Sequence, residues 1–329
     1  MRGAAFLFRR VVTVLLVVLI QLGITSTCLA AVSGESCRSD SISGDLRGGA
    51  IVNNIDEKTV SVIKKFITTI SSDDESKEFL IQGWRWHCMS LIRDADRLQK
   101  LATGLSRNKG NDNSEFEALV SATDFVVNVN MAGLYRVEST MFVKWLQKNL
   151  CSLDAFDEII DTSSVAAAFD EVINKINKQR VECERIGKKL YETSIASAKS
   201  SIKNDERQRH LREVVQLSTR LSDQLHSMRT LQEMLIVPSI SLVVPSSEQK
   251  TFNNKVLLAL GLLESRIHLV GMHDAVWESE NEIEKDLFVR EIPYVARIMI
   301  ERWRKSLYAP KGAWALDYKV ANQSEVPCS

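Results

Sequence analysis

The sequence contains few of the residues that break or turn a chain. Only 5 prolines and 14 glycines occur among its 329 residues. An all-β protein needs frequent turns, so this scarcity disfavours that fold class. The composition, 45% apolar and 26% charged, is that of a globular protein rather than a disordered or membrane-embedded one. The chain is therefore expected to form long helices.

Several signatures of enzymes and of small metal sites are also missing. The sequence has no G-x-G-x-x-G or G-x-x-x-x-G-K-[ST] phosphate loop and no G-x-S-x-G nucleophile elbow. No two cysteines are spaced as C-x-x-C, which argues against a zinc knuckle or a thioredoxin-like redox site. The sequence therefore gives no support to a function that depends on one of these motifs.

The first thirty residues are arranged like a signal peptide. Three arginines precede an almost continuous apolar run at residues 11–24, and small residues around Ala30 offer a cleavage point. We predict that residues 1–30 form a removable signal peptide and that residues 31–55 form a flexible lead-in. The implied compartment is the secretory pathway, as a secreted protein or in an organelle lumen. A two-part targeting sequence into a plastid is the alternative.

The charge of the chain gives no indication of a polyanionic partner. Acidic and basic residues are equal in number, 42 of each, and residues 1–30 contain three arginines and no acid. Removing that segment leaves 39 basic and 42 acidic side chains, a net charge of −3. We therefore expect no general attraction to nucleic acid or to anionic lipid. We also expect no membrane span after the signal peptide, because no later segment looks apolar enough to cross a bilayer.

Apolar residues recur at helical spacing from residue 56 onward. We predict an all-α fold, an antiparallel helical bundle over residues 56–308, followed by a C-terminal tail at residues 309–329. The link at residues 239–244, which lies between two prolines, is expected to be extended. Pro293 is expected to cap or kink the last helical region. The expected helical stretches are residues 75–103, 115–150, 163–201, 205–236, 249–278 and 280–308.

Side chains that can bind metal ions recur on four of these helices. The first long helix carries His87 and the second carries Glu138, while the fourth carries His226 and Glu233 and the fifth carries His268. An imidazole and a carboxylate one helical turn apart can chelate one ion. Facing helices of a bundle can then complete a carboxylate-bridged site. We therefore consider these five residues as candidate metal ligands.

The stretches that carry these residues resemble the hemerythrin-like, or HHE cation-binding, family. His87 followed by Leu91 and Arg93 is similar to the first helix of that family. Glu138 and the apolar residues after it are similar to the second helix, and residues 226–238 to the third. The resemblance covers four stretches spread over about two-thirds of the chain. It implies a four-helix core, with extra helices here, that holds mononuclear or di-iron centres through His, Glu and Asp.

The chain also departs from the pattern of that family. Leu134 stands four residues before Glu138, where the family has a histidine, and Met228 and Gln232 stand where His and Glu are expected. A thioether is soft and an amide is neutral, so both are poor ligands for iron. Two interpretations remain open. One is a bundle that binds iron or another divalent ion through a reduced site, and the other is a non-catalytic bundle that has lost its metal and serves as a partner-binding or structural module.

Overall fold

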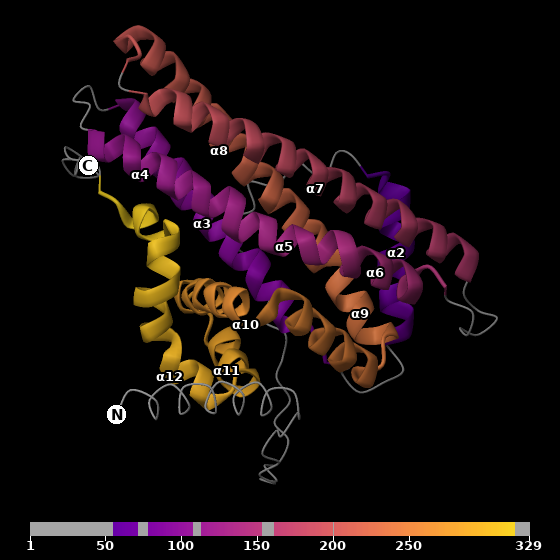
Figure 1. Ribbon diagram of the computed structural model, residues 1–329. Coiled ribbons are helices and arrows are strands. Elements are labelled where there is room, and N and C mark those ends of the chain that lie inside the picture. The colour runs from indigo at the N-terminus through magenta and orange to yellow at the C-terminus, as the bar shows by residue number, and fades with distance from the viewer. Residues whose placement is uncertain (1–54, 72–77, 108–112, 153–160, 200, 320–329) are drawn as a thin grey trace, which may run out of the picture. The chain divides into compact units, whose positions relative to one another are not determined.

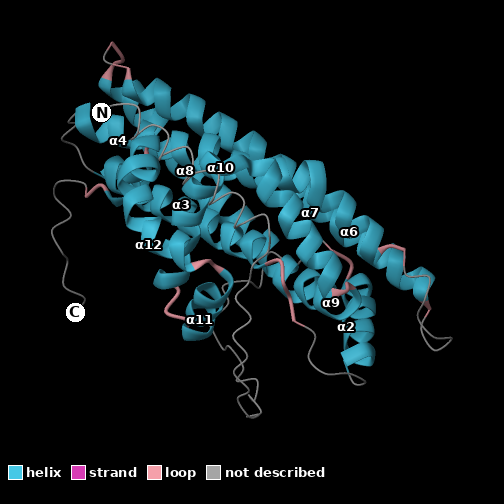
Figure 2. Cartoon of the chain, turned by 60° about the horizontal axis from the view of Figure 1, so that its bottom comes forward, coloured by secondary structure: helices cyan, strands magenta, loops and turns pink. Residues whose placement is uncertain are grey.

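The computed structural model is a bundle of helices, and the residues it describes contain no strand (Figures 1 and 2). This confirms the predicted all-α fold class. The predicted signal peptide, and the lead-in apart from its last residue, lie outside the described residues. The described residues are 55–71, 78–107, 113–152, 161–199 and 201–319.

Long helices from distant parts of the sequence pack together at the centre of the bundle. α3 (Gln82–Arg107) packs against both α8 (Asn204–Leu231) and α10 (Ser246–Glu278). α7 (Thr162–Ala198) packs along α8, and the two run side by side in Figure 1. α2 (Glu57–Ser71) packs on the same α7. The predicted bundle core is therefore present.

The buried side of α3 shows how the sequence specifies this packing. Leu91, Leu98 and Leu105 recur every seven residues, which places them on one side of the helix, and each is at most 2% exposed. Burying a leucine side chain contributes roughly 1.5–3 kcal/mol. His87 and Asp94 are also seven residues apart, and both are buried with the leucines. Residues seven apart lie nearly on one face of a helix, so these two polar residues share the buried face of α3.

The predicted helix at residues 115–150 is helical throughout but is not a uniform α-helix. Two of its segments are π-helical, and a third π-helical segment, η3 (Gln232–Ile236), directly follows α8. A π-helical turn contains one more residue than an α-helical turn, changes the direction of nearby side chains and is frequent at functional sites. The segments in order are α4 (Asn113–Asp124), η1 (Phe125–Met131), α5 (Ala132–Val137), η2 (Glu138–Phe142) and α6 (Val143–Leu150).

The segment expected to be an extended link is a helix. α9 (Val237–Val243) covers most of it, and Pro238 lies in the first turn of α9. A proline is tolerated there because the first backbone N–H groups of a helix have no partner within the helix. Ser239 and Ile240 are fully buried. The prediction of an extended chain was wrong because the first proline lies inside the helix rather than before it.

The C-terminal region is more ordered than predicted. Pro293 separates α11 (Glu282–Glu291) from α12 (Tyr294–Trp303), as expected. The chain then continues through η4 (Arg304–Tyr308) into two 3-10 helices, η5 (Ala309–Lys311) and η6 (Ala313–Asp317). η6 packs on α4 and α3 and buries Ala315 completely. The predicted boundary at residue 308 is therefore too early, and residues 320–329 lie outside the described residues.

α10 differs from expectation in two ways. By length and composition it is apolar enough to cross a membrane, and it is the one such helix in the described part of the chain. The sequence was expected to contain no such segment after residue 30. It is also bent, because Gly261 has non-helical backbone angles, φ 72° and ψ 169°. Only glycine adopts a positive φ of this kind at little cost.

Candidate functional site in the bundle core

His87 of α3 and His268 of α10 lie side by side in the core. Their ring centroids are 4.2 Å apart, and each residue is 3% exposed. The close approach of α5 depends on Gly133, because a Cβ atom at this position would lie 2.3 Å from Nε2 of His268. His268 Nε2 lies 3.4 Å from Oε1 of Glu264, whose pKa is lowered to about 2, chiefly by the hydrogen bond with His268. The structure thus brings together two of the five candidate ligands.

The imidazole of His87 is engaged by a buried asparagine. Its Nε2 lies 2.9 Å from Oδ1 of Asn130 in η1. The amide nitrogen of Asn130 donates to Oδ2 of Asp94 at 2.7 Å, which fixes the orientation of the amide. His87 Nε2 is therefore the donor in its bond to Asn130 and has no lone pair for a metal ion. Burial, assisted by the neighbouring His268, lowers the pKa of His87 well below its usual value and keeps the ring neutral.

A chain of hydrogen bonds continues from Asn130 toward the C-terminal region. Asp94 is fully buried and accepts from Nε and Nη2 of Arg93 at 2.9 and 2.6 Å. Nη2 of Arg93 also donates to the hydroxyl of Tyr308 at 2.9 Å. Burial raises the pKa of Asp94, and the Arg93 guanidinium opposes that rise. The network connects α3, η1 and η4. All of its groups are buried or nearly buried.

Glu138, the first residue of η2, has different partners. Its Oε1 accepts a hydrogen bond of 2.9 Å from Nε1 of Trp84, and the residue is 3% exposed. Burial raises its pKa to about 7, and the bond from Trp84 and the charge of Arg180 oppose the rise. The carboxyl group therefore changes its charge near neutral pH although it is buried.

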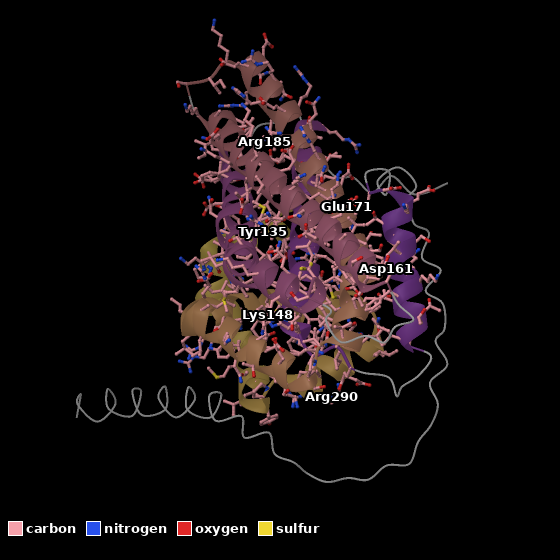
Figure 3. The ribbon with its side chains drawn as sticks, turned by 90° about the vertical axis from the view of Figure 1, so that its right-hand side faces the viewer. Tyr135, Lys148, Asp161, Glu171, Arg185 and Arg290 are labelled. Atoms are coloured by element: carbon pink, nitrogen blue, oxygen red, sulfur yellow. The ribbon has the colours of Figure 1, made fainter. Side chains whose placement is uncertain are left out.

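Glu138 lies beside a small, mostly apolar pocket between α6, α7 and η3. Gln232 also lines it; this residue is 2% exposed, and its Oε1 has no hydrogen-bond partner among the described residues. Tyr135, three residues before Glu138, shows where this region is: in the side view of Figure 3 it lies midway along the bundle, between Arg185 and Lys148. The residues lining the pocket are Glu138, Phe142, Val143, Leu146, Ile173, Ile176, Asn177, Arg180, Gln232 and Ile236.

The other two candidate ligands lie near the surface with partners of their own. Glu233 is ion-paired with Arg85 at 2.8 Å and also with Arg229. The side chain of His226 is 54% exposed, and its Nε2 lies 3.1 Å from Oδ2 of Asp96. The hydrogen bond with Asp96 raises the pKa of His226. Both residues therefore form part of ion pairs between helices.

The five candidate residues do not fit a single metal centre. Within the described residues, no group of three or more His, Cys, Asp or Glu side chains is placed to hold a metal ion. The positions where the family would supply further ligands are occupied by Leu134 and Met228, which are 2% and 3% exposed and pack in the core. The expected convergence therefore fails for a physical reason: apolar side chains fill the space, and the polar groups bind one another.

Sequence reasoning missed two residues that are central to this site, Asn130 and Arg180. Asn130 lies four residues after Val126 and four before Leu134, so its helical spacing could have placed it on the inner face. Arg180 lies in a strongly charged stretch, residues 174–189, of a kind that usually faces solvent, yet only 9% of it is exposed. No signal in the single sequence separates Arg180 from its charged neighbours.

No family model, curated protein or solved structure matches this chain significantly. The resemblance to the hemerythrin-like family therefore stays a prediction.

Proposed function

We propose that this protein is a non-catalytic helical bundle that acts by binding at its surface and not through a bound metal. The observation that carries this proposal is that His87, Glu138, His226 and Glu233 each have a separate protein partner. A metal ion would have to displace these partners or use the remaining Nδ1 of His87 and Oε2 of Glu138, and in either case the side chains would have to move together through a packed core. Such rearrangements are costly because protein interiors are close-packed.

The buried thiols support the non-catalytic part of the proposal. A cysteine is a nucleophile only as the thiolate. Burial raises the pKa of Cys88 well above its usual value and raises that of Cys183 to about 12. Both groups therefore stay protonated and behave as small apolar side chains.

The distribution of exposed apolar side chains supports the surface-binding part. Several large apolar residues of the C-terminal helices are more than half exposed. Where such side chains form a contiguous surface, that surface marks a site of interaction. The residues concerned are Leu258, Leu263, Ile283, Tyr294 and Ile298.

Metal content tests this proposal. The chain is expressed with added iron and manganese, purified without chelator, and analysed by elemental mass spectrometry. We expect less than about half an equivalent of total iron, manganese and zinc. We also expect the same midpoint of thermal unfolding with and without a chelator, because a bound structural metal would contribute to folding.

A matched variant makes the test sharper. His87→Ala removes the buried imidazole, whereas His226→Ala removes an exposed one, and we expect neither to change the metal content. Half an equivalent or more of metal in the wild-type chain, reduced by His87→Ala, would contradict the proposal and favour the metal-binding interpretation.

A further inference from the structure

The bend of α10 exposes a run of apolar side chains. Gly261 interrupts the helix, and Leu257, Leu258 and Leu263 on its two sides are 46%, 64% and 57% exposed. We call these three leucines and Gly261 the α10 elbow. Only 28% of the most apolar stretch of α10 is buried, whereas the core helix of a globular protein would be mostly buried. The exposure of the elbow therefore has no explanation in the packing of the fold.

The charged residues within residues 249–263 are all basic, and the acid just before this stretch, Glu248, is ion-paired with Lys148 at 3.2 Å. Residues 249–263 contain no acid, and they include two exposed lysines, Lys250 and Lys255. Among the described residues neither lysine forms an ion pair. The first acid after this stretch, Glu264, is bound at 2.7 Å by Arg136. The elbow thus combines apolar side chains with unpaired positive charge.

Another exposed apolar surface lacks this combination. On α11, Ile283 and Val289 are 79% and 40% exposed. They alternate with the exposed acids Glu282, Asp286 and Glu291. Negative charge at that surface would be repelled by an anionic membrane, so of these two surfaces the elbow is the better candidate for contact with lipid.

We propose that the α10 elbow docks onto an anionic lipid surface. The three leucines would enter the boundary between headgroups and acyl chains, and Lys250 and Lys255 would lie at the level of the phosphates. The net charge of the whole chain predicts no general attraction to such a surface, but the acid-free stretch supplies a local one. This inference rests on the proposed function, because it names the partner that the surface binds.

Vesicle binding tests the inference. The chain is used in full and also from Ala31 onward, so that the apolar run at residues 11–24 does not itself cause binding. Each form is sedimented with phosphatidylcholine vesicles, with or without about 30% phosphatidylserine. We expect the form that begins at Ala31 to bind the anionic vesicles and to bind more weakly as salt is raised.

Three variants separate the contributions. The triple change Leu257→Gln, Leu258→Gln, Leu263→Gln should reduce partitioning about tenfold or more. Lys250→Glu with Lys255→Glu should reduce binding to anionic vesicles about tenfold. These residues are exposed, so circular dichroism should show an unchanged fold. The control Ile283→Gln removes an equally exposed apolar side chain elsewhere and should bind as the wild type does.

Three results would overturn the inference: no binding by the form that begins at Ala31, equal binding by the triple variant, or binding by the full chain alone. If the triple change instead alters the oligomeric state without any vesicle binding, the elbow is a surface for self-association. Measuring the metal content of the same preparation keeps the two proposals apart. A metal-free chain that does not bind vesicles contradicts only the lipid proposal. A metal-loaded chain that binds vesicles contradicts only the proposed function.

Discussion

Glu138 shows what burial does to a single side chain in this fold. Its Oε1 accepts a hydrogen bond from Trp84, and burial raises its pKa from 4.5 to about 7. Between these two pH values the folded chain holds a proton on Glu138 that the unfolded chain has lost. Protons bound more strongly by the folded state stabilise it at low pH, so the contribution of Glu138 to stability decreases as pH rises from about 4.5 to about 7.

Replacing this carboxyl group should remove that pH dependence. For Glu138→Gln we expect the free energy of unfolding, relative to wild type, to rise by about 3 kcal/mol between pH 4.5 and pH 7.5. The glutamine oxygen can still accept the bond from Trp84. Urea unfolding at a series of pH values measures the difference. The exposed Glu117→Gln should follow the wild-type curve, and a Glu138→Gln curve parallel to wild type would contradict the assigned environment.

At the scale of helices, a group of partly buried charges connects α11 to the bundle. Arg85 of α3 binds Glu233 of η3 at 2.8 Å and also binds Glu284 of α11. Oε2 of Glu284 accepts a further bond of 2.9 Å from Nε1 of Trp86. The ring of Trp86 contacts that of Phe288, with centroids 4.9 Å apart. Glu284 and Phe288 thus both attach α11 to α3, and Phe288 also contacts the rings of His273 and Trp277 in α10.

Loss of that carboxylate should loosen α11 more than the rest of the bundle. Glu284→Ala leaves the buried Trp86 N–H without its acceptor and removes one partner of Arg85. We expect a loss of about 2–3 kcal/mol in the free energy of unfolding. Hydrogen exchange should show the largest loss of protection in α11. Glu282→Ala is the control, because this side chain is 78% exposed and should change stability by less than about 0.5 kcal/mol. If Glu284→Ala and Glu282→Ala lowered the free energy of unfolding equally, the contacts of Glu284 with Arg85 and Trp86 would be contradicted.

For the molecule as a whole, periodicity predicted most of the helices, and Pro293 itself predicted the break in the last helical region. Periodicity did so because helical spacing of apolar residues reflects burial directly. The spacing of His87 and Asp94 places them on one side of a helix but does not say that this side is buried. The partners of these residues depend on contacts between helices far apart in sequence, such as that between Asp94 and Asn130, and one sequence contains no record of them. The ordered segment at residues 309–319 was missed for a related reason, since its short 3-10 turns carry no long period.

Asp94 is the residue through which the core and the C-terminal region depend on each other. It accepts from Asn130 of η1 and from Arg93, which in turn donates to Tyr308 of η4. Asp94→Ala leaves the Arg93 guanidinium, whose side chain is only 11% exposed, without its buried counter-charge. Removing one partner of a buried ion pair costs about 3–5 kcal/mol, a large part of the stability of an ordinary domain.

Because the network spans distant segments, we expect this loss to appear as one global transition. Far-ultraviolet circular dichroism and tryptophan fluorescence should shift to lower urea by the same amount and remain coincident. Asp317→Ala is the matched control, since it removes a 70% exposed partner of Arg97 and should cost less than about 0.5 kcal/mol. If fluorescence instead reported early loosening of the C-terminal region alone, the network would be a local contact. The folding of η4 to η6 would then be independent of the histidine-containing core.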